Sequence, residues 1–280
     1  MNDSLRLHVQ RITHLPTLPV TARNILAVVD DDLASVNKLE NIIENDPAIS
    51  AKILSVANSA MYGFRTPANT LNNAIVRIGF SNVKNIALGI SLMTVLESGK
   101  HKSALDYQRV FNHSIAVGLT ATLLSKNLEM GVSEEMLIIG ILHDIGFLVL
   151  SRYFTDTYLK VLDACDGEKT LLDAEKEVFD FTHCDIGKWL AEKWALPDAI
   201  VDTISYHHSP SAAKGSVQHV ALVHAADVIA TQCIMSVTTR DPNYPFDPAC
   251  LDILGISGED FHELENQVKN ELLLNGSFRI

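Results

Sequence analysis

Histidine and aspartate side chains recur on apolar helix faces throughout the second half of this sequence. Each lies three, four or seven residues from apolar neighbours, so a helix would turn it toward the interior of the protein. Imidazole nitrogens and carboxylate oxygens are the common ligands of transition metals. The candidate ligands in chain order are His113, His143, Asp144, His183, His207 and Asp227.

The two aspartates carry the strongest argument for a metal. Asp144 and Asp227 have no lysine or arginine within one helical turn, and an isolated buried carboxylate costs many kcal/mol. Neutral imidazoles cannot neutralise such a charge, whereas a divalent cation can. A mixed imidazole and carboxylate set suits iron or manganese, with zinc or nickel as alternatives, better than magnesium or calcium. We therefore expect one or two divalent transition metal ions.

Each candidate residue also has a plainer interpretation. A single histidine on an apolar face is usually a core residue bonded to a backbone carbonyl. His207 and His208 could cap the C-terminus of a helix, where a cation is favourable. His224, one turn before Asp227, could orient a ligand or have no role. The recurrence of inward histidine and aspartate in five separate places favours the metal site.

Composition limits the classes of partner. The chain has 280 residues, of which 47% are hydrophobic, and a formal net charge of −12 without a long basic run. Nucleic-acid backbones and anionic membrane surfaces both require clustered lysine and arginine, so neither is an expected partner. The four cysteines form no close-spaced pair, and we interpret them as buried, reduced thiols of a cytoplasmic protein.

The apolar segments are helical in pattern and too short to cross a bilayer. The longest, Met136 to Leu150, falls short of the roughly 20 residues needed, and we interpret it as one buried core helix. The first residues lack the apolar core of a signal peptide. These features predict a soluble protein.

Helix punctuation dominates the chain, and no segment alternates with the period of a strand. Asp46-Pro47 and Pro197 read as helix starts, and Thr70 to Gly79 as one capped helix. The polar stretch Glu97 to Asp106 and the proline-rich stretch Asp241 to Pro248 read as boundaries. We predict an all-α protein with an N-terminal helical subdomain (1–100), a second-half bundle (101–240) and a tail (241–280).

Several segments carry a family resemblance over roughly residues 12 to 235. The segments are LPTLP at Leu15 to Pro19, NDPAISAKILSVANSAMYG at Asn45 to Gly63, AIVRIGFSNVKNIAL at Ala74 to Leu88, ILHDIGFLVL at Ile141 to Leu150, HCDIGKWLAEKWALP at His183 to Pro197 and YHH at Tyr206 to His208. They resemble the HDOD family of bacterial signalling proteins. The order of histidines and aspartates resembles the wider HD superfamily of metal-dependent phosphohydrolases, in its HD-GYP-like form.

The resemblance implies an N-terminal helical subdomain packed on an HD-type helical bundle. It also implies that His113, His143 and Asp227 hold one metal, that His183 and His207 hold a second, and that Asp144 bridges the two. His208 would lie close by. The implied function is bacterial signal transduction, with a protein partner and an intact metal site. The alternative is an active phosphohydrolase acting on a phosphoester or nucleotide, which would bind a phosphorylated small molecule.

Three positions depart from the HD-GYP pattern. Phe147 stands where those enzymes place a phosphate-contacting lysine, three residues after the HD aspartate. Arg109 lies one turn before His113, where some members place a glutamate. The segment Ser209 to Gln218 lacks the GYP sequence. We therefore expect little hydrolysis of cyclic di-GMP.

The N-terminal half lacks an inward cluster of histidine and aspartate. Its segment Asn58 to Pro67 combines aromatic and polar residues in an expected loop. That loop either binds a partner or packs on the bundle.

Overall fold

The computed structural model describes residues 3–12, 17–28, 33–58, 62, 66–97, 103–165, 169–233 and 245–274. Within these ranges every regular element is helical, which confirms the predicted all-α fold. The elements are α1 Asp3–Arg11, α2 Val20–Leu26, α3 Leu33–Glu44, α4 Pro47–Ala57, α5 Leu71–Ile78, α6 Phe80–Glu97, α7 Tyr107–Asn127, α8 Ser133–Leu142, α9 Ile145–Tyr153, α10 Thr155–Ala164, α11 Leu171–Phe179, α12 His183–Lys193, α13 Asp198–Tyr206, η2 Pro210–Ala212, α14 Val217–Cys233, α15 Ala249–Leu254 and α16 Gly258–Leu274.

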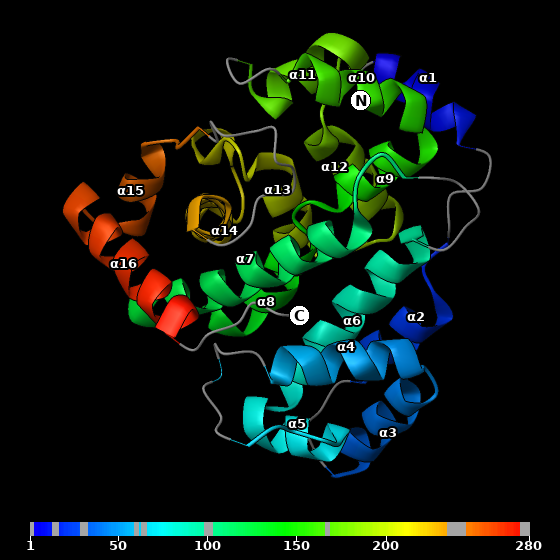
Figure 1. Ribbon diagram of the computed structural model, residues 1–280, viewed down its shortest axis with the longest axis vertical. Helices are drawn as coiled ribbons and strands as arrows, with labels where there is room; N and C mark the ends of the chain where they lie inside the picture. Colours follow the sequence, from blue (N-terminus) through cyan, green and yellow to red (C-terminus); the bar gives the residue numbers. More distant parts are fainter. Residues whose placement is uncertain are drawn as a thin grey trace.

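The helices lie in two groups (Figure 1). Helices α2 to α5 gather at one end, and α6 connects them to the rest through contacts with α8 and α9. In the centre, α7 packs against both α8 and α14. Helix α12 packs against α9 and α13, while α15 and α16 flank α14 on the outside. The six candidate ligands therefore lie on helices that pack directly on one another, or at the ends of such helices.

Local capping explains why the N-terminal helices begin where they do. The Asp46 side chain accepts hydrogen bonds from the backbone N–H groups of Ala48 and Ile49 and so caps α4. Thr70 caps α5 in the same way, and α5 ends at Gly79, whose φ of 89° favours glycine. The predicted start of α4 and the predicted start and stop of α5 are confirmed.

The prediction of one continuous helix over Met136 to Leu150 was wrong. The chain leaves α8 at Leu142 and enters α9 at Ile145, because Asp144 (φ −100°, ψ 17°) lies outside helical geometry. By length and composition alone the stretch Glu135–Tyr153 could still cross a membrane, yet 89% of its apolar window is buried inside the protein. It behaves as an interior segment, and the cytoplasmic location stays a prediction.

Two glycine contacts let the central helices approach closely. A Cβ on Gly140 of α8 would lie 2.3 Å from the Cα of Gly118 on α7. A Cβ on Gly146 of α9 would lie only 1.9 Å from the carbonyl oxygen of His183, at the start of α12. Both distances are far below van der Waals contact. Gly118 and Gly140 therefore allow α7 to approach the end of α8, and Gly146 allows α12 to lie against α9.

Long-range contacts tie the two halves together. The Arg152 guanidinium of α9 donates to the carbonyl of Val95 (3.2 Å) near the end of α6. Helix α1 packs on the second half, because the Ser4 hydroxyl donates to the Phe179 carbonyl (2.6 Å) and the His8 ring packs edge-on against Phe154 and its neighbours. The predicted domain limits stay predictions, and residues 98–102 lie outside the described ranges.

The segment predicted as a partner-binding loop is described only in part. The Asn58 side chain bonds to both backbone groups of Ala68, which closes the segment at its base. Tyr62 is half-buried and packs against the core. Phe64 lies outside the described residues. Packing explains Tyr62, and the proposed partner contact stays a prediction.

Replacing Gly146 should test whether the close approach of α9 and α12 is required. We expect Gly146→Ala to lower the free energy of unfolding by about 1–3 kcal/mol, because the added methyl meets backbone and cannot be accommodated by a rotamer change. Gly258→Ala is the matched control, since no atom lies within 4 Å of its added Cβ. Urea unfolding of both variants measures the difference. Equal stability would show that the crossing has more room than the structure indicates.

Candidate metal centre

All six predicted ligands converge in the interior, and none is more than 3% exposed. His113 comes from the middle of α7, and Asp227 from the middle of α14. His143 and Asp144 occupy the break between α8 and α9. His183 opens α12, and His207 follows the end of α13. Separate stretches of chain therefore meet at one buried centre.

Asp144 lies between two pairs of histidines and directs one oxygen toward each. Its Oδ2 lies 3.2 Å from Nε2 of His143 and 3.6 Å from Nε2 of His113. Its Oδ1 lies 3.3 Å from Nε2 of His207 and 3.6 Å from Nε2 of His183. A carboxylate arranged in this way can bridge two cations, one on each side.

Asp227 closes the first side of the centre. Its Oδ1 lies 3.0 Å from Nε2 of His113, and its Oδ2 lies 3.7 Å from Nε2 of His143. The Thr231 hydroxyl donates to Oδ1 from one turn further along α14 (3.2 Å). The first side thus gathers two imidazoles and two carboxylates, while the second side has imidazoles and the remaining oxygen of Asp144.

Three of the histidines are oriented by bonds on their outer nitrogens. Nδ1 of His143 donates to the carbonyl of Gly140 (2.7 Å), and Nδ1 of His207 donates to the carbonyl of Ile204 (3.1 Å). Nδ1 of His183 donates to a carboxylate oxygen of Glu175 (2.8 Å). A neutral imidazole that donates through Nδ1 keeps a lone pair on Nε2. All three lone pairs then face the centre, as in histidine ligands of metals.

The charges at the centre require a positive partner. Burial would raise the pKa values of Asp144 and Asp227, but the adjacent histidines hold both well below the usual range, so both carboxylates stay ionised. Burial lowers the pKa of His143, and the same carboxylates raise it to about 10. Without a metal, protons on the histidines would therefore supply the positive charge.

The residues present fit a divalent transition metal. Nε2 of His143 and Oδ1 of Asp144 are buried and make no hydrogen bond within the described part of the chain. Every ion-pair contact of the two aspartates in that part of the chain involves histidine. Nitrogen and oxygen donors of this kind suit iron, manganese, zinc or nickel.

Glu175 is a buried site residue that sequence analysis did not single out. It is fully buried, accepts both the backbone and the ring N–H of His183 through Oε2, and accepts the Tyr158 hydroxyl through Oε1 (3.0 Å). A signal was present in the sequence, since Glu175 lies four residues from both Leu171 and Phe179 on the buried face of α11. Glu175 fixes the ring orientation of His183.

Cys184 is the second residue that the sequence analysis passed over. Its Sγ lies 3.5 Å from Nε2 of His183, in a cluster with His207 and His208. Burial would raise the pKa of its thiol, but the charges of His183 and His207 lower it to about 6. Cys165 and Cys250 are free and buried, as predicted.

The additional candidate residues have different positions. Nε2 of His208 lies 3.0 Å from Nε2 of His183 and so adjoins the second side. His224 uses both ring nitrogens on backbone: Nδ1 donates to the His207 carbonyl (2.7 Å), and Nε2 accepts from the N–H of Asp247 (2.9 Å). It therefore holds the His207 turn in place. Arg109 is half-buried on α7 one turn before His113, and its role stays a prediction.

Phe147 takes part in packing at the second side. Its ring is 3% exposed and stacks on the His183 imidazole, with ring centroids 3.8 Å apart and an interplanar angle of 29°. Phe147 therefore supports a candidate metal ligand, and its ring has no group that could bond to phosphate.

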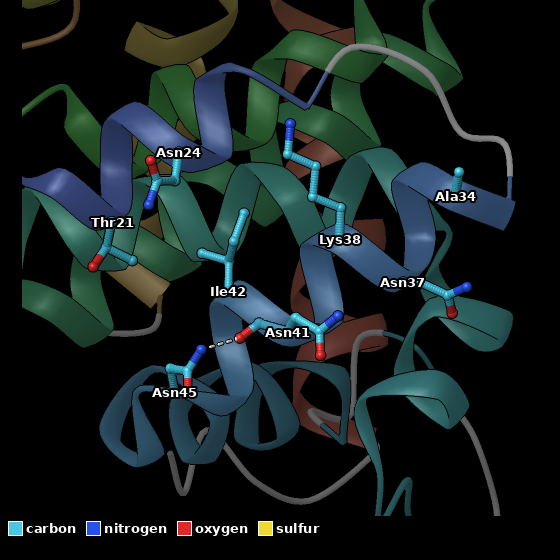
Figure 2. A pocket seen from close by; sticks show the side chains of 8 residues that line it. All are labelled: Thr21, Asn24, Ala34, Asn37, Lys38, Asn41, Ile42 and Asn45. Carbon is cyan, nitrogen blue, oxygen red and sulfur yellow. Dashed lines mark hydrogen bonds between the residues drawn. The ribbon is translucent and has the colours of Figure 1, made fainter.

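A separate cleft of about 470 Å³ lies between α2 and α3, away from the histidines (Figure 2). Its lining is mainly neutral and polar, with Asn24, Asn37 and Asn41 beside Lys38. Amides suit hydrogen bonding to a polar ligand or peptide. Its lining residues include no histidine and no carboxylate. They all lie in the N-terminal half of the chain, apart from the candidate metal centre.

One relative matches most of this chain. A protein from Treponema pallidum (strain Nichols), itself uncharacterized, is 23% identical over 202 residues, which cover 71% of this chain and 38% of that protein. The chain thus spans well under half the length of that relative.

Two crystal structures show the same fold. An HDOD domain protein of unknown function from Geobacter sulfurreducens has a TM-score of 0.74 at 22% identity, over 98% of this chain and 89% of that one. A candidate signal transduction protein from Marinobacter aquaeolei VT8 has a TM-score of 0.72 at 23% identity, over 98% of this chain and 64% of that one. These TM-scores establish a shared fold.

The sequence itself identifies the family. The model of the HDOD domain matches residues 15–210, a span that contains five of the six converging residues and ends before Asp227. Helix α14 supplies Asp227 from beyond the match, and it packs on α7 so that the set is complete. This chain belongs to the HDOD domain family.

Proposed function

We propose that this protein is an HDOD-type signal-transduction protein that holds a pair of divalent transition metal ions at its buried centre. His113, His143 and Asp227 would hold one ion, His183 and His207 the other, and Asp144 would bridge them. The observation that carries the proposal is the shared orientation of three imidazoles, which donate outward through Nδ1 and direct Nε2 toward Asp144.

Without bound cations the arrangement would be costly. Two buried carboxylates and the histidine nitrogens face one another in a space from which solvent is excluded, so protons on the histidines would have to balance the charge. Metal ions satisfy all of these atoms at once. The outward bonds to backbone carbonyls and to Glu175 keep each ring in place before an ion arrives, which reduces the entropy lost on binding.

The alternative function is a phosphohydrolase acting on a phosphoester or nucleotide. A bound pair of ions would supply Lewis acidity and lower the pKa of water at the centre. The chain's own contribution to substrate binding favours the signalling function, because Phe147 offers neither a charge nor an N–H donor and is packed on His183. A protein partner for the signalling role, and a phosphorylated ligand for the enzymatic one, stay predictions.

Removing the bridging carboxylate should remove most of the metal. We expect wild-type protein to bind at least one transition metal ion per chain, and Asp144→Asn to bind far less, because the substituted amide would offer no negative charge to either ion. Elemental analysis after reconstitution and desalting measures this. Asp252→Asn, an exposed position on α15, is the matched control and should retain the wild-type metal content. Wild-type protein that takes up no metal would refute the proposal.

Glu175 should set the affinity of the second ion. Glu175→Gln keeps the side-chain volume but leaves a single side-chain oxygen as acceptor. Three donors would then compete for it: the Tyr158 hydroxyl and the backbone and ring N–H groups of His183. We expect the affinity for that ion to fall about 10–100-fold, the usual effect of losing a partner of a metal-bound histidine. Titration calorimetry compares it with Glu177→Gln, an exposed position on the same helix. Unchanged affinity would mean that packing, including the Phe147 ring, suffices to orient His183.

Metal-loaded protein should not hydrolyse cyclic di-GMP appreciably. Loss of one preorganised contact to developing charge lowers the rate by about 10²–10³, and Phe147 cannot make that contact. Chromatography of reaction mixtures with iron- or manganese-loaded protein measures product. An HD-GYP enzyme loaded in the same way is the positive control. Turnover comparable to that control would make the phosphohydrolase the primary function.

A further inference from the structure

Four potential ligands gather on the second side of the centre, and one of them is a thiol. His183, Cys184, His207 and His208 each offer one ligand atom, and these atoms all lie within 4.8 Å of one another. His183 and Cys184 form the first turn of α12, whereas His207 and His208 follow α13. Two helix ends thus present three imidazoles and one sulfur to the same point.

The distances from Nε2 of His183 to the other ligand atoms lie close to the edges of a coordination tetrahedron. Bonds of about 2.0–2.1 Å to nitrogen and about 2.3 Å to sulfur place two nitrogens about 3.4 Å apart, and nitrogen and sulfur about 3.6 Å apart. Nε2 of His183 lies 3.4 Å from Nε2 of His207, 3.5 Å from Sγ of Cys184 and 3.0 Å from Nε2 of His208. An ion held by His183, His207 and Cys184 would keep its fourth position for Oδ1 of Asp144, which lies 3.6 and 3.3 Å from the same two imidazoles.

Local structure holds Cys184 in this position. Thr182 and Asp185 form a capping box that fixes the first turn of α12, and Gly146 lets that turn lie directly against α9. Cys184 is 8% exposed, so its sulfur is directed inward. The other buried thiols differ, since Sγ of Cys165 and Sγ of Cys250 each donate to a backbone carbonyl.

We propose that Sγ of Cys184 is a direct ligand of the ion on the second side, which makes the two metal positions chemically unequal. On binding, the thiol loses its proton to solvent and the sulfur–metal bond forms. Thiolate and imidazole favour zinc or iron, whereas the carboxylate-rich first side also suits manganese. The inference rests on the proposed metal centre and adds a ligand and a metal preference to it.

X-ray absorption at the zinc edge tests the ligand directly. Full-length protein loaded with zinc alone should show a sulfur shell at about 2.3 Å. Cys184→Ala should lose that shell, while Cys165→Ala and Cys250→Ala should keep it. Cobalt-loaded protein gives a second readout, because a thiolate ligand adds a near-ultraviolet charge-transfer band that Cys184→Ala should lack.

The outcomes separate this inference from the proposed function. Bound zinc without a sulfur shell, or a shell that survives in Cys184→Ala, overturns the role of Cys184 and leaves the metal centre standing. Absence of bound zinc overturns both. If Cys184→Ala does not fold, a variant carrying Cys165→Ala, Cys233→Ala and Cys250→Ala decides, because Cys184 is then the remaining thiol and the sulfur shell must persist.

Discussion

The burial of the Asp144 carboxylate between two pairs of imidazoles is the constraint on which the rest of this structure depends. Its two oxygens face opposite sides, and its charge cannot be solvated because the side chain is 3% exposed. Helices α7 and α14 each carry a ligand candidate, and the other candidates lie at the ends of α8, α12 and α13. The break between α8 and α9 follows from the same constraint, since an unbroken helix would not direct His143 and Asp144 to the same centre.

Close helix crossings deliver the remaining groups. Gly118 and Gly140 bring the backbones of α7 and α8 together, and Gly146 brings α9 against the first turn of α12. Outside the centre, hydrogen bonds from histidine Nδ1 atoms to fixed acceptors determine where the Nε2 atoms lie. The site is therefore positioned by backbone contacts more than by flexible side chains. Such rigidity keeps the imidazoles and carboxylates in place before cations bind.

Much of this organisation could be predicted from the sequence because helices have a fixed period. An inward face identifies His113, His183 and Asp227 as buried, and capping residues such as Asp46 and Thr70 locate helix starts. The period could not reveal the break at Asp144, since the apolar pattern continues through it. It also could not reveal Cys184, whose importance depends on the approach of the end of α13 to the start of α12, a tertiary contact.

The central claim is that Asp144 bridges two metal ions, and anomalous diffraction from crystals of metal-loaded protein tests it most directly. The account predicts two anomalous peaks on opposite sides of the Asp144 carboxylate, separated by about 3.5–4 Å as in other paired-metal sites. One peak would lie between His113, His143 and Asp227, and the other beside His183 and His207. An intact fold with no peak at this centre, or with metal bound only elsewhere, would contradict the account.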